Sequence, residues 1–125
     1  HIAHRIGRAL NDDKKSIRDS KILILGIAYK KDNDDVRESP ALRIMELLKH
    51  KGAKINYHDP YVENVGSLKS LDLTKNTIEE QDAIIITTDH TSIDYSLLGK
   101  YARLIVDTRN IMATVKNPKA RVIRA

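Results

Sequence analysis

A charged loop in the first third of the chain contains the residue types best suited to binding chemistry. It follows the apolar run 22–25, which predicts a strand buried on both faces of a parallel sheet. Lys30, Lys31 and Arg37 stand in this loop among four acidic residues. Ligands of open α/β sheets bind beyond the carboxyl ends of the strands, where this loop must lie. The pattern therefore indicates a binding site rather than a simple connection.

Arg37 is the residue of this loop best placed to bind phosphate. It precedes Ser39-Pro40, which predicts a helix start with serine as the N-cap and proline as the first helical residue. The guanidinium group matches phosphate oxygens, and the helix N-terminus adds positive potential. Spacing alone allows equally a solvated salt-bridge cluster with the neighbouring acidic residues Asp34, Asp35 and Glu38.

Two other polar pairs end predicted strands but favour structural roles. Asp59-Pro60 lies where a Rossmann fold places its ribose-binding acid, yet an Asx-type turn fixed by proline is the favoured interpretation. Asp89 and His90 close the third strand, where no nucleophile is evident, so we expect helix capping by Asp89 or Thr91. The turn after the first strand lacks the Gly-x-Gly-x-x-Gly phosphate loop, which argues against a self-sufficient dinucleotide site.

Arg109 follows the fourth predicted strand and should reach the same crevice as the charged loop. It belongs to the segment Asp107-Thr108-Arg109 at the carboxyl edge of the sheet. Either Arg109 binds a ligand there, or Asp107 braces it in a structural pair. The spacing of the residues is equally compatible with both.

Composition excludes several classes of function. The 125 residues suffice for one core, and the net charge of +5 comes from basic residues scattered along the chain. Scattered charge favours anionic small molecules over nucleic acid. Without cysteine the chain has no disulfide, thiolate metal site or cysteine nucleophile, which fits a cytoplasmic protein. No apolar run approaches a membrane span, and the five histidines show no ligand spacing, so we expect neither membrane nor metal.

The elements that must position these residues alternate along the chain. Apolar spacing predicts helices at 1–17, 39–51, 77–81 and 93–100. Strands are expected at 21–28, 53–58, 83–87, 104–106 and 121–123, with a short one near Leu71. This order predicts an α/β fold, a Rossmann-like three-layer sandwich with a mainly parallel sheet, preceded by the end of a long helix.

Together these segments resemble the C-terminal, UDP-binding domain of the UDP-glucose/GDP-mannose dehydrogenase family. The matching segments run in the family's order at 25–32, 35–40, 52–54, 57–61, 88–90 and 107–110. Thr-Asp-His at 88–90 and Asp-Thr-Arg-Asn at 107–110 are most similar to the branch that oxidises UDP-N-acetylglucosamine or UDP-N-acetylmannosamine.

The resemblance implies a two-step oxidation of a sugar C6 alcohol to a carboxylate with two NAD⁺, for polysaccharide precursor synthesis. It also implies roles for individual residues. Tyr29 and Lys30 match residues that contact the UDP-sugar, and Arg109 matches an arginine that binds the nucleotide sugar. Arg37 matches an arginine that reaches NAD, which is bound mainly by the N-terminal domain. On this basis, binding is preferred over the salt-bridge alternatives for both arginines.

The resemblance further implies a division of the chain and a partner. Residues 1–18 would end the central linker helix, which carries the homodimer interface, and residues 19–125 would form the UDP-sugar-binding domain. The catalytic cysteine and the NAD-binding glycines of the family would lie upstream, in the N-terminal domain. We therefore expect no catalytic residue in this chain and no activity from it alone. The alternative is a stand-alone, non-catalytic nucleotide-binding or interaction module.

Overall fold

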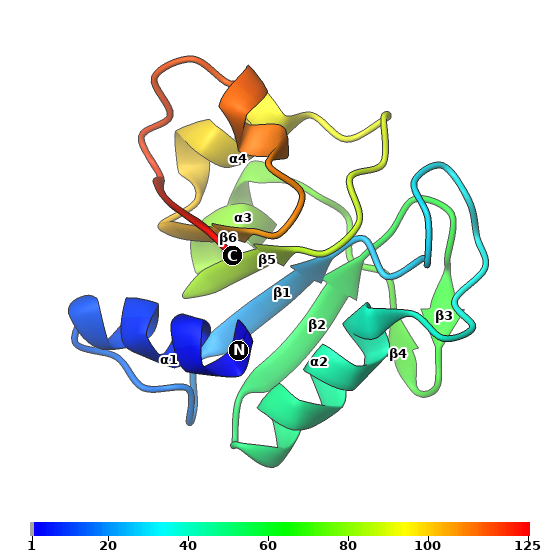
Figure 1. The fold of residues 1–125 in the computed structure, drawn as a ribbon, viewed down its shortest axis with the longest axis horizontal. Helices are drawn as coiled ribbons and strands as arrows, with labels where there is room; N and C mark the ends of the chain where they lie inside the picture. Colours follow the sequence, from blue (N-terminus) through cyan, green and yellow to red (C-terminus); the bar gives the residue numbers. More distant parts are fainter. Residues whose placement is uncertain (1) are drawn as a thin grey trace.

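The computed structural model describes residues 2–125 and places a five-stranded parallel sheet between two helical layers (Figure 1). Across the sheet the strands follow the order β2-β1-β5-β6-β7, and each adjacent pair is parallel. Their bounds, in that order, are Lys54–His58, Lys21–Leu25, Ala83–Ile86, Leu104–Asp107 and Arg121–Arg124. The expected three-layer α/β fold is confirmed.

The central strands are continuous apolar runs because both faces of the sheet are covered. All four residues of β5 and the last four of β1 are buried. Helices α1 (Ile2–Asp12) and α2 (Pro40–His50) pack on one face. Helices α3 (Lys75–Glu80) and α4 (Tyr95–Tyr101) pack on the other, together with the 3₁₀ helix η1 (Ile111–Thr114). Because the chain lacks phenylalanine and tryptophan, these two cores consist mainly of Ile, Leu, Val and Ala.

The strand order reverses beside β1, which makes this the switch point of a doubly wound sheet. The chain places β2 on one side of β1 and then crosses to place β5 on the other. Ligands of such sheets bind in the crevice at the carboxyl ends of the strands near the reversal. The loop 26–39, which carries the predicted binding residues, leaves β1 at this edge.

Several boundaries differ from those expected from sequence. The predicted helix 1–17 ends at Asp12, since Lys14 adopts a left-handed conformation with φ 61°; its first residue lies outside the described part of the chain. The short strand expected near Leu71 is β4 (Leu68–Lys69), which ends two residues before it; Leu71 itself donates its N–H to the Tyr57 carbonyl of β2. β4 pairs with β3 (Asn64–Val65) in a hairpin, and neither this pairing nor η1 was predicted.

The helix start expected at Ser39-Pro40 is confirmed. The Ser39 hydroxyl accepts the Ala41 N–H, and Pro40 is the first residue of α2. Gly52, with φ 97°, follows the helix as expected. None of the helices within residues 2–125 has the length and apolar character needed to cross a bilayer.

Candidate functional site

The loop 26–39 is anchored where it leaves β1. Asp59, at the end of β2, accepts the N–H groups of Ile27 and Ala28 on one carboxylate oxygen, at 2.8 and 3.0 Å. The carbonyls of the same two residues accept the hydroxyls of Ser39 and Thr88, at 2.6 and 2.5 Å. The N–H and carbonyl groups of Ile27 and Ala28 are therefore all bonded within the protein.

Asp59 forms the expected Asx-type turn. Its second carboxylate oxygen accepts the Tyr61 N–H at 2.8 Å, and its side chain has no exposed surface. A buried carboxylate that accepts N–H groups from two segments of the chain holds the edge of the sheet together. It does not face outward, as a ribose-binding acid must.

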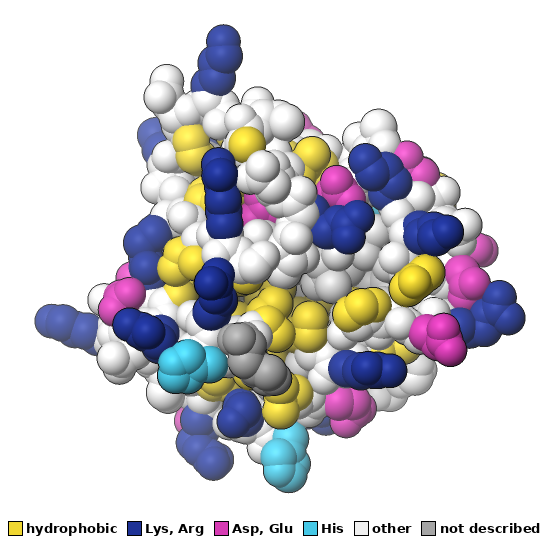
Figure 2. Space-filling model, in the orientation of Figure 1, with side chains coloured by type: hydrophobic (Ala, Val, Ile, Leu, Met, Phe, Trp, Pro, Cys, Tyr) yellow, Lys and Arg dark blue, Asp and Glu magenta, His cyan; other side chains and the backbone are white. Residues whose placement is uncertain are grey.

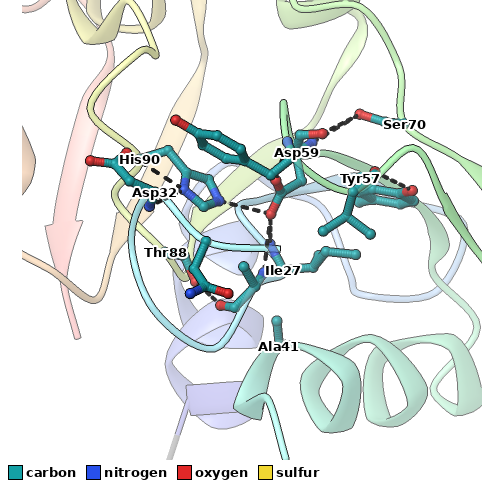
Figure 3. A network of polar contacts seen from close by, with 12 residues as sticks. Ile27, Asp32, Ala41, Tyr57, Asp59, Ser70, Thr88 and His90 are labelled. Carbon is teal, nitrogen blue, oxygen red and sulfur yellow. Dashed lines mark hydrogen bonds and ion pairs between the residues drawn. The ribbon is translucent and has the colours of Figure 1, made fainter. Parts of the chain in front are cut away.

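His90 joins the same network, in a role that its sequence position did not indicate. The buried ring places Nε2 2.9 Å from the Asp59 carboxylate, and Nδ1 accepts the Asp32 N–H at 2.7 Å (Figure 3). The expectation of helix capping by Asp89 or Thr91 is wrong, because Asp94 is the N-cap of α4. Sequence reasoning missed His90 because its two partners lie 31 and 58 residues away.

Asp32 connects the loop to the segment that follows β5. Its carboxylate accepts both the N–H and the hydroxyl of Thr91, at 2.8 and 2.5 Å. These hydrogen bonds hold the pKa of Asp32 below its usual range. The middle of the loop is thereby fixed to the carboxyl end of the neighbouring strand.

Arg109 emerges at this edge with its side chain about half exposed (47%). Its Nε lies 3.3 Å from one oxygen of Asp89, and the Nζ of Lys31 lies 3.6 Å from the other. Asp107 braces the backbone of this segment, because its carboxylate accepts the N–H groups of Arg109 and Met112. The structure thus brings two cations together at one acidic side chain, and sequence reasoning had assigned a binding role to neither Asp89 nor Lys31.

Arg37 occupies the salt-bridge arrangement weighed as the alternative from sequence. Its guanidinium donates to both oxygens of Asp35, at 3.0 and 2.9 Å, and its side chain is 87% exposed. These side-chain hydrogen bonds lower the pKa of Asp35 to about 2 and raise the pKa of Arg37. Arg37 precedes the first residue of α2 in the chain, as expected, and its guanidinium is open to solvent.

Tyr29 and Lys30 lie at the exposed part of the loop. Tyr29 is 52% exposed, and its N–H donates to the Asp35 carbonyl at 2.7 Å. Lys30 forms no ion pair with any of the described residues. Both side chains are therefore available to a ligand, although it is Lys31, and not Lys30, that shares an acidic partner with Arg109.

A cavity of about 510 Å³ lies beside Arg109. Its polar lining comes from Arg5 of α1 and from residues that follow β5 and β6, Thr87, Thr108 and Arg109. Within the described residues, the buried Oγ1 of Thr87 is without a hydrogen-bond partner. Arg5 and Arg109 place two cations around one hollow, which suits an anionic ligand. No cluster of three potential metal ligands is found within residues 2–125.

The comparison with protein families matches this region of the chain. Residues 23–114 match the UDP-binding domain of the UDP-glucose/GDP-mannose dehydrogenase family. UDP-N-acetyl-D-mannosamine dehydrogenase of Pyrococcus horikoshii is 38% identical over 107 residues, covering 80% of this chain and 24% of that protein. UDP-glucose 6-dehydrogenase of Rhizobium meliloti is 33% identical over 126 residues, covering 82% and 29%.

Solved structures show the same likeness. The UDP-D-ManNAc dehydrogenase of Pyrococcus horikoshii superposes with a TM-score of 0.73 and 31% identity, covering 94% of this chain and 28% of that one. A UDP-glucose dehydrogenase from Pyrobaculum islandicum gives a TM-score of 0.71 at 25% identity, covering 94% and 27%. The chain spans about a quarter of the length of the relatives it matches.

Proposed function

The chain belongs to the UDP-glucose/GDP-mannose dehydrogenase family, and we propose that it is the nucleotide-sugar-binding domain of an NAD-dependent UDP-sugar 6-dehydrogenase. The whole enzyme would oxidise the sugar C6 alcohol to a carboxylate, in the cytoplasm, for polysaccharide precursor synthesis. We place the substrate among the UDP-N-acetylhexosamines, because several relatives are UDP-N-acetyl-D-mannosamine dehydrogenases. Relatives named UDP-glucose 6-dehydrogenase make UDP-glucose the substrate to compare.

The observation that carries this proposal is the pair of cations held at Asp89. Arg109 and Lys31 lie at the carboxyl edge of the sheet, and Arg109 lines the cavity beside it. A diphosphate offers each cation a more highly charged partner than one carboxylate. Charge-assisted hydrogen bonds of this kind contribute about 1.5–3 kcal/mol each. We assign Arg109 to the UDP portion, with Tyr29 and Lys30 contacting the same ligand from the loop.

The dispersed distribution of the other basic side chains supports a small anionic ligand rather than nucleic acid. On the face shown in Figure 2, lysine and arginine side chains are dispersed and interleaved with acidic ones. Nucleic-acid binding usually draws on a concentrated basic stripe. We therefore assign binding of the anionic ligand to the pair of cations at Asp89, rather than to the net charge of +5.

NAD would accept the hydride when bound, but its pyrophosphate does not fit the turn that follows β1. The N–H groups of Ile27 and Ala28, which would have to face a pyrophosphate there, both donate to Asp59. The exposed guanidinium of Arg37 fits a single contact to a dinucleotide held elsewhere. We therefore propose that another domain of the whole enzyme binds most of NAD and that Arg37 reaches it from this chain.

The remaining parts of the proposal concern the whole enzyme. Residues 1–18 would end the central linker helix of a homodimer, and residues 19–125 would form the UDP-sugar-binding domain. In the structure the helix ends at Asp12, and residues 13–20 connect it to β1. The chain has no cysteine, so a catalytic thiol would have to come from the N-terminal domain, and we expect this chain alone to be inactive.

The mutation Arg109→Ala in the whole enzyme is expected to raise the KM for the UDP-sugar at least about tenfold. The reason is the loss of a charge-assisted hydrogen bond of about 1.5–3 kcal/mol to the diphosphate. The KM for NAD should change less than about twofold. Steady-state kinetics with each substrate varied in turn measure both values. Arg43→Ala, which removes an exposed arginine of α2, is the matched control. An unchanged KM for the UDP-sugar would remove Arg109 from the site.

The mutation Arg37→Ala is expected to act on the other substrate. It should raise the KM for NAD by about threefold to tenfold, because the guanidinium is solvent-exposed and must leave Asp35 to reach a phosphate. The KM for the UDP-sugar should stay nearly constant. Kinetics with NAD varied at saturating UDP-sugar test this assignment, again with Arg43→Ala as control. A selective effect on the UDP-sugar would contradict it.

A further inference from the structure

His90 connects three segments that lie far apart in the sequence (Figure 3). It follows β5, its Nε2 meets Asp59 at the end of β2, and its Nδ1 meets the backbone of Asp32 in the middle of the loop. The ring is fully buried, and the Tyr61 ring lies over it with 4.8 Å between the centroids. Every polar atom of the imidazole is thus committed to a named partner.

The partners define the protonation state of the ring. A backbone N–H can only donate, so Nδ1, 2.7 Å from the Asp32 nitrogen, must accept and carries no proton. Nε2 then carries the proton and donates it to the Asp59 carboxylate at 2.9 Å. The geometry specifies a neutral imidazole, in one tautomer, beside a buried carboxylate.

The Nδ1 contact is made to the loop that carries two candidate ligand-binding residues. Asp32 is held at its N–H by His90 and at its carboxylate by Thr91. Tyr29 and Lys30 lie three and two residues before it, respectively, in the exposed part of the loop. We propose that His90 is a positioning residue, whose neutral Nε2–H form sets the place of Tyr29 and Lys30 through the backbone of Asp32. The proposal rests on the proposed function for the role of those two side chains.

Protonation of His90 reverses one of its two contacts. A proton on Nδ1 would face the Asp32 N–H, so two donors would oppose each other and the loop would have to move. The Asp32 carboxylate, whose Oδ1 is 3.9 Å from Nδ1, would then be the nearest acceptor. The Asp59 contact would persist, because Nε2 keeps its proton in both forms. Acidification should therefore release the loop while leaving the turn at Asp59 in place.

The charged and titratable groups that face the ring come from several elements. Asp59 faces it from the end of β2 and Asp32 from the loop. The Tyr61 ring covers it, and the Tyr95 hydroxyl from α4 donates to the His90 carbonyl. Among these groups, the Asp32 amide is the one whose contact requires an Nδ1 without a proton. The loop contact is consequently the one that acidification breaks.

Two substitutions separate the contacts of the ring. In His90→Asn the side-chain carbonyl lies near the position of Nδ1 and can accept the Asp32 N–H, but the amide cannot reach Asp59. In His90→Gln the amide nitrogen lies near the position of Nε2 and can donate to Asp59, but the Asp32 N–H loses its acceptor. His50→Gln, an exposed histidine in the last turn of α2, is the control.

The test is amide hydrogen exchange, followed by NMR in the whole protein without nucleotide. We expect exchange at Asp32, relative to the core amide of Ile85, to rise at least about tenfold in His90→Gln and less than about threefold in His90→Asn. In the wild type it should rise on acidification together with the titration of the His90 ring, and this pH dependence should vanish in His90→Asn. Equal effects of both variants, or no effect of His90→Gln, would overturn the proposal.

Two further readouts keep the outcome decisive. Ring ¹⁵N shifts of the wild type should show an unprotonated Nδ1 near neutral pH, and a protonated Nδ1 would overturn the assignment even if the variants failed to fold. The KM for the UDP-sugar should rise at least about tenfold in His90→Gln and stay within about threefold in His90→Asn. Altered exchange without altered KM would retain the positioning of the loop and refute instead the ligand role of Tyr29 and Lys30.

Discussion

Replacing Gly26 with alanine is expected to lower the free energy of unfolding by at least about 4 kcal/mol. Gly26 directly follows β1 with φ 81°, and an added Cβ would lie 2.2 Å from the carbonyl oxygen of Thr88. The left-handed conformation alone costs a non-glycine residue about 1–2 kcal/mol. The contact with Thr88 is with backbone and cannot be relieved by a side-chain rotation. Urea unfolding of both proteins measures the difference.

Gly66→Ala is the matched control for this prediction. Gly66 also has a left-handed φ, 56°, but a Cβ added there meets no atom within 4 Å. We expect it to cost about 1–2 kcal/mol, the conformational part alone. If Gly26→Ala lowered the free energy of unfolding no more than Gly66→Ala, the close contact between Gly26 and the Thr88 carbonyl would be contradicted.

Asp59→Ala is expected to destabilise the protein by about 3–5 kcal/mol. The carboxylate accepts N–H groups from Ile27, Ala28 and Tyr61, and the ring N–H of His90. Each buried donor left without an acceptor costs about 1–3 kcal/mol, although water entering the space left by the side chain will reduce the sum. Thermal or denaturant unfolding measures the loss, and exchange of the Ile27 and Ala28 amides should locate it.

Two variants define what Asp59 contributes. Asp59→Asn keeps the shape and one acceptor oxygen but turns an NH₂ group toward one donor, so we expect a loss of about 1–3 kcal/mol. Asp72→Ala removes an exposed carboxylate and should change stability by less than about 0.5 kcal/mol. An Asp59→Ala protein as stable as Asp72→Ala would mean that Asp59 is not the anchor of the loop.

Local patterns predicted the parts of the fold that depend on neighbouring residues. The apolar runs of β1 and β5 indicated buried parallel strands, because a sheet covered on both faces needs no polar alternation. Ser39-Pro40 predicted the start of α2, since capping is a contact between residues two positions apart. Asp59-Pro60 predicted an Asx-type turn for the same reason.

The contacts that build the candidate site are not local, and spacing could not predict them. His90 meets residues 31 and 58 positions away, and Arg109 meets Asp89 at a distance of 20 residues in sequence. Such pairs depend on which strands are neighbours in the sheet. The alternation of strands and helices along the chain does not determine that order. The hairpin of β3 and β4 was missed because two-residue strands show no alternation, although Gly66-Ser67 between them is a typical hairpin turn.

We propose that the ligand binds away from the turn that Rossmann-like folds commonly use. Asp59 occupies the N–H groups of the first turn, so that part of the switch point is closed by the protein's own carboxylate. Two cations, Lys31 in the loop after β1 and Arg109 after β6, lie beside Asp89. A domain built in this way suits a nucleotide held by side chains rather than by a glycine-rich loop.

A calorimetric titration of UDP into the whole protein, repeated with Arg109→Ala and with the control Arg43→Ala, tests the central claim most directly. We predict saturable binding by the wild type and the control, weakened at least about tenfold by Arg109→Ala. Binding that is equally strong in all three proteins would contradict the assignment of UDP to the edge at Asp89. The absence of UDP binding to the wild type would contradict the proposed function itself.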